Sequence, residues 1–411
     1  MKYLMLLLFI LGIFSTQARE IVVCNTCEVT TIKEAVALAQ DGDLIRIKAG
    51  TYKENDIHII NKSIKIVGEK NSILDAEMKG SALNVQAENF SIEGLTIKNI
   101  GKSHTREFAA ILIARSSNFE ISNTILENVF FGILVERSSM GKITGNRVSS
   151  NATRQDNSGN GIHLFHSNEM EITHNIVTGT RDGIYLEFTN ESLISNNICK
   201  DNLRYGLHFM FSNNNQYIEN VFESNGAGVA VMFSKNIKMI RNHFKKSWGN
   251  AAFGLLLKEI NDAELKHNIF ENNTVAISAD GTNRINYIEN DFKNNGYAVK
   301  IRGACYKNIF YRNNFLYNAF DVAYNGQINE NSFDQNYWSN YSGYDLDKDG
   351  IGDVPHRPVK LFSYLVNKSP EAIVLLRSLF IDIIDFSEKV SPIFTPADLI
   401  DANPKMKQLV W

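Results

Sequence analysis

The stretches "GIHLFHSNEMEITHN" (residues 161–175) and "GIYLEFTNESLISNN" (residues 183–197) decide the fold of this chain. Each contains two short runs of alternating apolar and polar residues, with a polar corner between them and an asparagine at the end. The same unit starts at six glycines, with spacings of 29, 22, 23, 22 and 26 residues: Gly132, Gly161, Gly183, Gly206, Gly228 and Gly254. A period near 22 residues with short strands and no helical periodicity is typical of a parallel β-helix. We therefore predict an all-β fold built of coils of about 22 residues.

An asparagine follows the second apolar run of each repeat. These residues are Asn123, Asn146, Asn175, Asn197, Asn220, Asn242, Asn268, Asn290 and Asn314. An inward-facing amide at a corner can bond both the backbone of its own coil and the amide of the next coil, so we predict a structural ladder of asparagines. The two longer spacings indicate insertions at residues 151–160 and near residues 245–253, which we expect to protrude as loops.

The N-terminal end differs from the repeats. Residues 1–18 combine Lys2, an apolar run and a small-residue stretch, a pattern typical of a signal peptide cleaved after Ala18. An uncleaved anchor is the alternative, and the expected mature protein is exported. Residues 31–40 predict a short amphipathic helix that covers the open edge of the first coil. We expect the β-helix to occupy residues 19–340.

The C-terminal part has another composition, because all six prolines lie at or after Pro355. We divide it into an acidic loop and linker, residues 341–368, and a helical tail, residues 369–411. The tail predicts a helix from Glu371 to Lys389 that is apolar over most of its circumference. Charged residues interrupt this helix, so we do not expect it to span a bilayer. We interpret it as a surface that docks a partner.

Charge and cysteine content exclude some classes of protein. A formal net charge of −3 gives no reason to expect nucleic acid as a partner. Four cysteines are too few for a disulfide scaffold, and Cys199 and Cys305 fall at apolar positions of the repeat, where we expect core thiols. Cys24 and Cys27 form a CxxC motif that fits either a local disulfide or a thiolate metal site.

A candidate metal site follows from the register of the repeats. Residues one and three positions after each leading glycine are apolar and should face the core, so those two and four positions after it should face outward. This places His208, Met210 and Met232 in one outward-facing patch on adjacent coils. Two thioethers and an imidazole suit Cu(I) better than Zn(II), Ca(II) or Mg(II). The alternative is that the methionines only fill space beneath a loop or a partner.

Two further residues lie near this patch in the predicted register. Glu187 stands one coil from Met210, and His163 stands beyond it. We expect both to support the copper ligands rather than to bind the ion directly.

The acidic loop contains "DLDKDGIGD" (residues 345–353). Asp345, Asp347, Asp349 and Asp353 match positions 1, 3, 5 and 9 of a calcium-binding loop. Position 12 is His356 instead of the usual glutamate, so the bidentate ligand is missing. The segment predicts a calcium site, with a solvated acidic turn as the alternative.

Three stretches resemble the NosD family of nitrous oxide reductase maturation proteins: "NLRYGLHFMFSNNN" (residues 202–215), "GAGVAVMFSKNI" (226–237) and "NYWSNYSGYDLDKDGIGDVPHRPV" (336–359). The resemblance covers nearly the whole mature chain. It implies a right-handed β-helix in the periplasm, held at the inner membrane by an ABC transporter that consists of a permease and an ATPase. It also implies that Cu⁺ comes from a copper-chaperone lipoprotein and serves apo nitrous oxide reductase. This favours the copper interpretation of His208, Met210 and Met232.

The alternative function is that of a secreted polysaccharide lyase or hydrolase. Such enzymes need acidic groups on the outer face of the β-helix. Asp182 and Glu187 are the only carboxylates near the patch, which is a weak case for a glycosidase. We therefore expect an accessory protein without catalytic activity, with ATP hydrolysis in a partner subunit.

Overall fold

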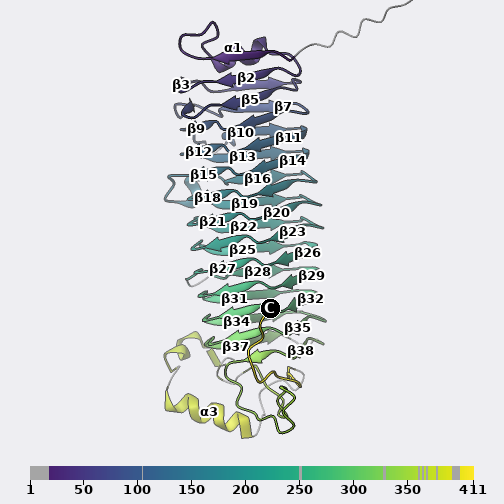
Figure 1. Ribbon diagram of the computed structural model, residues 1–411. Coiled ribbons are helices and arrows are strands. Elements are labelled where there is room, and N and C mark those ends of the chain that lie inside the picture. The colour runs from purple at the N-terminus through teal and green to yellow at the C-terminus, as the bar shows by residue number, and fades with distance from the viewer. Residues whose placement is uncertain are drawn as a thin grey trace, which may run out of the picture.

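The structure is a computed structural model, and it describes residues 18–411 except 104, 250–251, 327–329, 360–361, 363–364, 367–368, 376–377 and 391–398. It is a right-handed parallel β-helix of about 14 coils, as predicted (Figure 1). Each complete coil contributes one strand to each of three parallel sheets. The predicted signal peptide lies outside the described residues except for Ala18.

The 14-stranded sheet forms the first side of the β-helix. It consists of β1 (Glu20–Val23), β2 (Leu44–Ile47), β5 (Lys65–Gly68), β8 (Ser91–Glu93), β11 (Ser117–Ser122), β14 (Ser139–Thr144), β17 (Glu171–Thr173), β20 (Leu193–Ser195), β23 (Gln216–Ile218), β26 (Lys235–Ile240), β29 (Asn261–Lys266), β32 (Asn283–Ile288), β35 (Ile309–Tyr311) and β38 (Ser332–Asp334).

The 13-stranded sheet follows it along each coil. Its strands are β3 (Gly50–Lys53), β6 (Ser72–Asp75), β9 (Thr96–Lys98), β12 (Ile125–Glu127), β15 (Arg147–Ser149), β18 (Ile176–Thr178), β21 (Ile198–Lys200), β24 (Val221–Glu223), β27 (His243–Lys245), β30 (Ile269–Glu271), β33 (Asp291–Lys293), β36 (Asn314–Leu316) and β39 (Tyr337–Trp338).

The 12-stranded sheet completes the coil and carries the candidate copper site. Its strands are β4 (Ile57–Ile60), β7 (Leu83–Gln86), β10 (Ala109–Ala114), β13 (Phe131–Glu136), β16 (Ile162–Phe165), β19 (Asp182–Glu187), β22 (Tyr205–Met210), β25 (Ala227–Met232), β28 (Leu255–Lys258), β31 (Val275–Asp280), β34 (Tyr297–Gly303) and β37 (Phe320–Gly326).

Apolar side chains of successive coils stack on one another in the interior. On β22 the alternating residues Leu207 and Phe209 are fully buried, as the period-2 pattern predicts. Rings stack on one another inside the 13-stranded sheet, from Phe222 through Phe244 to Phe270, at centroid distances of 5.4 and 4.6 Å. Cys199 is also fully buried, which confirms the prediction of a core thiol.

The asparagine ladder is present, with two corrections to its membership. It runs through Asn146, Asn175, Asn197, Asn220, Asn242, Asn268, Asn290, Asn313 and Asn336, and each amide nitrogen except the last donates to the next amide oxygen. Thr124, and not the exposed Asn123, occupies the first position. Asn313 replaces the predicted Asn314. Both errors are shifts of one residue at a corner, where the apolar pattern does not define which residue turns inward.

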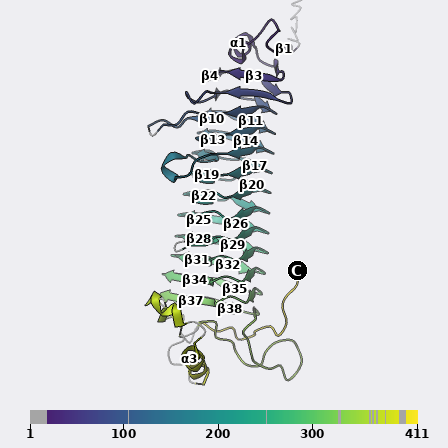
Figure 2. The same cartoon turned by 90° about the vertical axis from the view of Figure 1, so that its left-hand side faces the viewer.

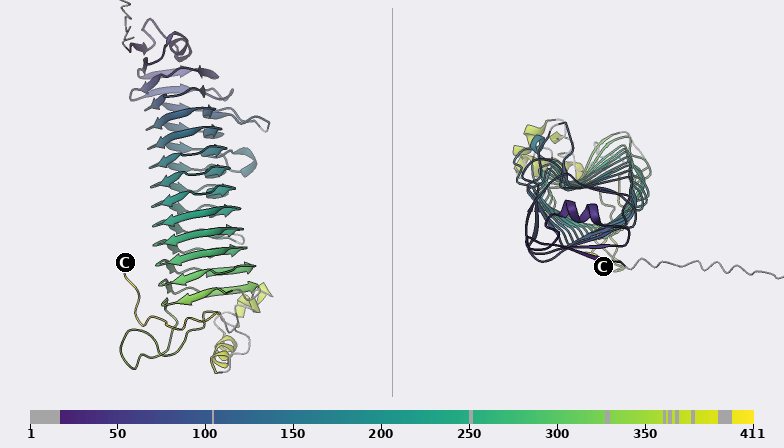
Figure 3. Two further views of the ribbon diagram at one scale, coloured as in Figure 1. Left: turned by 90° about the vertical axis from the view of Figure 1, so that its right-hand side faces the viewer. Right: turned by 90° about the horizontal axis from the view of Figure 1, so that it is seen from above.

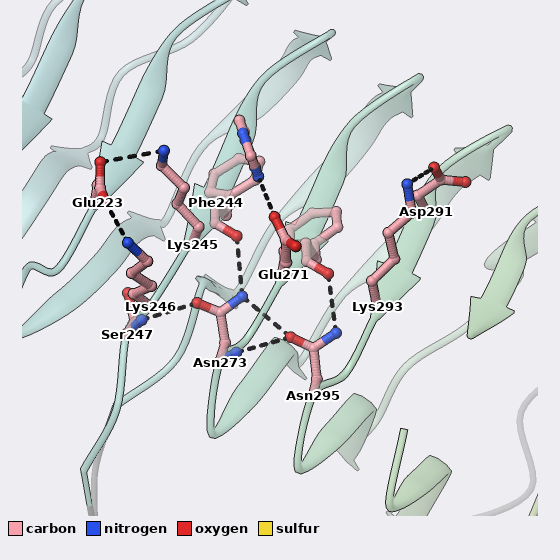
Figure 4. A network of polar contacts seen from close by, with 12 residues as sticks. Glu223, Phe244, Lys245, Lys246, Ser247, Glu271, Asn273, Asp291, Lys293 and Asn295 are labelled. Atoms are coloured by element: carbon pink, nitrogen blue, oxygen red, sulfur yellow. Dashed lines mark hydrogen bonds and ion pairs between the residues drawn. The ribbon is translucent and has the colours of Figure 1, made fainter. Parts of the chain in front are cut away.

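A second amide ladder stabilises another corner (Figure 4). Asn273 donates to the Phe244 carbonyl oxygen at 3.0 Å and to Asn295 Oδ1 at 3.1 Å, while Asn295 donates to the Phe270 carbonyl oxygen at 2.9 Å. The backbone amide of Ser247 donates to Asn273 Oδ1 at 3.0 Å. These bonds satisfy backbone groups that the corners leave without strand partners.

The N-terminal end is covered as predicted. Helix α1 (Ile32–Leu38) starts at Thr31, whose hydroxyl accepts from the Glu34 amide, and lies across the end of the β-helix (Figure 3). Its buried face protects the first coil from pairing with other chains. Cys24 and Cys27 form a disulfide, which settles the two alternatives for this motif.

The tail differs from the single helix predicted from Glu371 to Lys389. A 3-10 helix, η2 (Pro370–Leu375), precedes the α-helix α3 (Leu379–Val390), and Ser378 between them is not helical. Phe362 of the linker and Ile381 of the tail pack on the outer side of the last coils, against Tyr297 and Phe320. None of the helices in the described part of the chain is long and apolar enough to cross a membrane.

The last residues of the chain return along the β-helix (Figure 1). Asp401 is fully buried and ends the asparagine ladder, because its carboxylate accepts from the amide nitrogen of Asn336 at 3.1 Å and from Trp338 Nε1 at 3.0 Å. Farther along, the Leu409 amide donates to Asn314 Oδ1 at 3.0 Å. The C-terminal segment thus completes the last coil.

Candidate functional site

The candidate site lies on the outer face of the 12-stranded sheet, between two segments of the chain that cover other parts of this face. Towards the N-terminus, the insertion that contains η1 (Gln155–Asn157) protrudes from the flank, as predicted (Figure 2). A cavity of about 660 Å³ separates it from Phe131 and Leu134. Towards the C-terminus, the tail covers β34 and β37. The middle strands, β19, β22 and β25, lie between the two.

The structure brings the three predicted copper ligands onto neighbouring strands. Met210 of β22 pairs in register with Met232 of β25, and His208 lies two residues before Met210 on the same face. Both methionines are half-buried, whereas only 6% of the His208 surface is exposed. His208 lies outside the apolar core that its neighbours Leu207 and Phe209 join, so it faces outward and is covered there.

Two residues that the sequence did not identify as partners hold His208 in place. Asp182 Oδ2 lies 3.4 Å from His208 Nδ1, and Arg204 binds the same carboxylate through two nitrogens, with Nε 2.7 Å from Oδ1. Asp182 is fully buried. Burial alone would raise the pKa of Asp182, but the bonds from Arg204 and His208 outweigh it and hold that pKa below its ordinary value. The carboxylate is therefore charged at neutral pH.

This arrangement leaves one imidazole nitrogen for a ligand. Nδ1 of His208 lies 3.4 Å from Asp182 Oδ2, which favours a proton on Nδ1, and 3.5 Å from the Arg204 guanidinium, which favours a lone pair there. With the proton on Nδ1, Nε2 has a free lone pair. Nε2 of His208 is buried and has no hydrogen-bond partner within the described part of the chain. Most buried polar atoms have a partner, so an unpaired nitrogen beside two thioethers marks a place where a ligand could bind. An imidazole and two thioethers suit Cu(I), with the Asp182 carboxylate behind the imidazole, and copper at these residues stays a prediction.

His163 does not come close enough to share an ion with His208. The two rings belong to a stacked column, the ring column, which consists of Phe131, His163, Tyr185 and His208. Tyr185 lies between the two imidazoles, with centroid distances of 4.7 Å to His163 and 4.4 Å to His208. Any support that His163 gives to a copper ligand must pass through the Tyr185 ring.

His163 is neutral in the folded protein. Burial lowers its pKa from 6.5 to about 3, and the positive charge of Arg181 adds to this effect. Neither ring nitrogen of His163 has a hydrogen-bond partner among the described residues. The ring column therefore contains two buried imidazoles with unpaired nitrogens.

Glu187 pairs in register with Met210, one coil towards the N-terminus. It is half-buried, and its charge acts together with burial to raise the pKa of Tyr185. Its position beside the methionines agrees with a supporting role, which stays a prediction.

The carboxylate pair considered for a glycosidase is not arranged for acid–base catalysis. Asp182 is fully buried and bound by Arg204, so its oxygens are not open to a substrate. The sequence did carry a signal for the contact between Asp182 and Arg204. Asp182 and Tyr205 each precede a leading glycine and pair across adjacent strands, which places Arg204 next to Asp182. The residue directly before each leading glycine also faces outward. The prediction considered only the positions two and four after the glycine and so missed it.

The acidic loop brings together three of its four predicted ligands. Oxygens of Asp345, Asp347 and Asp349 lie within 4.8 Å of one another, and this group is largely exposed. Backbone amides of the loop donate to Asp345, and the carboxylate of Asp349 helps to raise the pKa of Asp347. Asp353 accepts instead from the Leu346 amide at 2.8 Å. Calcium at this loop stays a prediction.

Comparisons with known proteins agree with the fold and point to one family. The family described as "Periplasmic copper-binding protein (NosD)" matches residues 148–343, and the family described as "Right handed beta helix region" matches residues 11–179. The first match contains all three candidate copper ligands.

Two curated relatives match along most of the chain. The "Probable ABC transporter binding protein NosD" of Stutzerimonas stutzeri is 27% identical over 382 residues, which cover 88% of this chain and 86% of the relative. The protein of the same description from Pseudomonas aeruginosa is 27% identical over 394 residues, with 91% of each chain covered.

Solved structures show likeness of fold only. The catalytic domain of a GH87 α-1,3-glucanase in complex with nigerose has a TM-score of 0.58 and 12% identity, and the match covers 77% of this chain and 69% of that chain. At this level of identity the likeness says nothing about a shared reaction.

Proposed function

Because the chain belongs to the NosD family, we propose that it is a periplasmic maturation factor that binds Cu(I) during assembly of the copper sites of nitrous oxide reductase. In this role it works with an ABC transporter, receives Cu(I) from a copper-chaperone lipoprotein and passes it towards the apo-reductase. The names of the curated relatives support the transporter, and the description of the matched family supports the periplasm and copper.

One observation supports the copper site above all. His208 is buried with its Nδ1 at Asp182 and its Nε2 unpaired, next to two methionines on adjacent strands. His163 also has unpaired nitrogens, but only His208 has two thioethers beside it on the same face. Cu(I) bound by Nε2 and the two sulfur atoms would supply the missing partner.

The test is Cu(I) titration of a variant with Met210→Ala and Met232→Ala. We expect Cu(I) affinity to fall by a factor of about 100 or more, equivalent to about 2.7 kcal/mol, since two of three ligands are lost. Both side chains lie outside the apolar core cluster, so the thermal midpoint should change little. The control is Met78→Ala with Met140→Ala, two exposed methionines elsewhere. Wild-type affinity in the Met210/Met232 variant would exclude this site.

We further propose that the tail docks on the permease and thereby holds the protein at the inner membrane. The tail exposes an apolar surface on the side opposite Ile381, which is buried on the β-helix. Its members are Val374, Leu375, Leu379, Phe380, Ile383 and Phe386. An apolar patch of this kind on an exported protein is typical of an interface.

The docking proposal is tested with point substitutions, because removal of residues 369–411 would also remove Asp401 and so open the last coil. Leu379→Gln, Ile383→Gln and Phe386→Gln together should abolish co-purification with the permease and its ATPase, with an intact fold and intact Cu(I) binding. Leu346→Gln, at an equally exposed leucine of the acidic loop, is the control. Full co-purification of the triple variant would refute the docking role.

The acidic loop supports a separate proposal of a calcium site. Calcium held by Asp345, Asp347 and Asp349 would stabilise the folded state by mass action. We expect the thermal midpoint to rise on addition of millimolar calcium, and we expect Asp347→Asn to abolish the rise. Equal melting curves with calcium and with chelator would identify the segment as a solvated acidic turn.

A further inference from the structure

One corner of four consecutive coils carries a row of exposed rings, which we name the aromatic ridge: His166, Phe188, Phe211 and Phe233. The four residues directly follow β16, β19, β22 and β25 and have left-handed backbones, with φ of 49°, 51°, 51° and 53°. Left-handed φ is unfavourable for side chains with a Cβ and least so for glycine and asparagine. In other coils the same corner is occupied by Arg115, Arg137 and Glu259, also with left-handed backbones, and by Gly281 and Gly303. The coil geometry therefore does not account for three phenylalanines in succession.

The rings of the aromatic ridge present their edges, and not their faces, to solvent. Successive centroids lie 4.6, 5.2 and 5.1 Å apart, and the planes differ by 5°, 7° and 14°. At the two ends, the Phe165 ring meets His166 at 4.4 Å, and Lys258 Nζ lies 5.9 Å from the centroid of Phe233. Sugars and nucleobases bind to the faces of aromatic rings, which here are covered. Apolar protein side chains can pack against such edges.

The phenylalanines are exposed, and amides border most of the ridge. Phe188, Phe211 and Phe233 expose 37%, 40% and 39% of their surfaces. On the far side of the ridge, Asn190 donates to Asn168 at 3.3 Å, and the column continues through Asn213 to the exposed Lys235.

The other border is the column that contains the candidate copper ligands. On four successive strands this column consists of Phe165, Glu187, Met210 and Met232, each in register with the next. The Phe165 ring contacts both His166 and Phe188, so the column and the ridge touch. Met210 and Met232 directly precede two of the ridge phenylalanines. The ridge and the methionines thus form one continuous apolar surface.

Lys258 stands at the end of this surface, in register with Asp280 of the next coil. Lys258 follows Met232 in the same column and holds its ammonium group over Phe233. It forms no ion pair within the part of the chain that the structure describes. A partner with a carboxylate at the matching place would pair with it in a water-poor interface, where the interaction gains strength.

We propose that the aromatic ridge is the docking surface for the protein that exchanges Cu(I) with Met210 and Met232. This proposal rests on the copper function proposed above. Cu(I) passes between proteins by exchange of ligands, so the surfaces around the two ligand sets must touch and exclude water. The occupant presents apolar side chains to the ridge edges and a carboxylate to Lys258. The corner itself does not require phenylalanine, and the contact with the partner accounts for it.

The experiment separates copper binding from copper transfer. The test variant combines Phe188→Asn with Phe211→Asn, since asparagine tolerates left-handed φ and should not strain the coil. Affinity is measured by competition with the small chelator bicinchoninate. Transfer is measured as the rate of Cu(I) movement from the loaded copper-chaperone lipoprotein of the source organism in detergent. The matched control is Tyr317→Asn, at an exposed aromatic residue with φ of 55° on a different corner.

We expect the double variant to keep wild-type affinity for chelator-delivered Cu(I) and to lose protein-to-protein transfer by a factor of about 10 or more. Lys258→Glu should slow transfer by a similar factor, and Tyr317→Asn should not change it. Normal affinity with a wild-type transfer rate in the double variant would overturn the docking surface alone. Wild-type protein that takes no Cu(I) from the chelator would overturn the copper function itself and this proposal with it. A wild-type dimer that the double variant cannot form, seen by sedimentation, would identify a second copy as the occupant and also overturn it.

Discussion

The asparagine ladder and the ring column are both buried stacks with one residue per coil, but they treat their polar atoms in opposite ways. In the ladder, Asn220 donates to the Ile194 carbonyl oxygen at 2.9 Å and to Asn242 Oδ1 at 3.0 Å, and it accepts from Asn197. In the ring column, both nitrogens of His163 and Nε2 of His208 have no partner among the described residues. Unpaired buried groups cost free energy, whereas paired ones contribute to stability.

The difference separates what the fold requires from what it only tolerates. Every coil needs its corner amides paired, and the ladder provides this over nine asparagines and Asp401. No coil needs an imidazole on its outer face, since Ala230 and Leu256 occupy the same column in later coils. Substitutions in the ladder should therefore destabilise the protein, and substitutions in the ring column should not.

The largest effect is expected at the end of the ladder. Asp401→Ala leaves the backbone amide and side-chain amide of Asn336, together with Trp338 Nε1, without an acceptor in a buried site. We expect the free energy of unfolding to fall by about 3–5 kcal/mol, since three buried donors each lose their acceptor. Urea denaturation measures it. Asp401→Asn keeps an acceptor oxygen and should lose less, and equal stability of Asp401→Ala and wild type would show that the C-terminal segment is dispensable.

An interior rung of the ladder should give the next largest effect. Asn220→Leu conserves volume but removes the acceptor for Asn197 and the donor to Ile194 and Asn242. We expect a loss of about 2–4 kcal/mol in the free energy of unfolding, since several buried groups become unpaired. Denaturation in urea, with the exposed Asn151→Leu as control, checks this value. A loss below that of the control would mean that the ladder amides add nothing beyond their volume.

The smallest effect at neutral pH is expected in the ring column. His163→Phe keeps the stack between Phe131 and Tyr185 and removes two unpaired nitrogens, so the free energy of unfolding at pH 7 should change by no more than about 1 kcal/mol. A large loss at pH 7 would remove the contrast between the two stacks.

The same substitution should alter the response to acid. The pKa of His163 is about 3 in the folded protein and near 6.5 in the unfolded chain, so between these values only the unfolded chain takes up the proton. Stability is fully present above pH 6.5 and falls by up to about 1.4 kcal/mol per pH unit below it. Between pH 7 and pH 5 the wild type should therefore lose about 2 kcal/mol more than His163→Phe. Equal losses of stability in the wild type and in His163→Phe would show that His163 becomes protonated in the folded protein.

The sequence determined the coils, their register and the set of candidate copper ligands. Glycines at intervals of about 22 residues and strict alternation around them define which residues face the core, because a shift of one residue would move every side chain to the other face. That rule placed His208, Met210 and Met232 on one surface, and the register confirms their neighbourhood. The capping helix and the core position of Cys199 follow from equally local patterns.

Tertiary structure alone decided which polar groups meet. The Arg204–Asp182 pair that orients His208, the choice of Asn313 over Asn314 and the return of Asp401 to Asn336 all depend on competition between nearby donors and acceptors. Apolar periodicity says which face a residue occupies, and it carries no information about which partner a polar side chain will find there. That choice is made by distance and desolvation in the assembled coil.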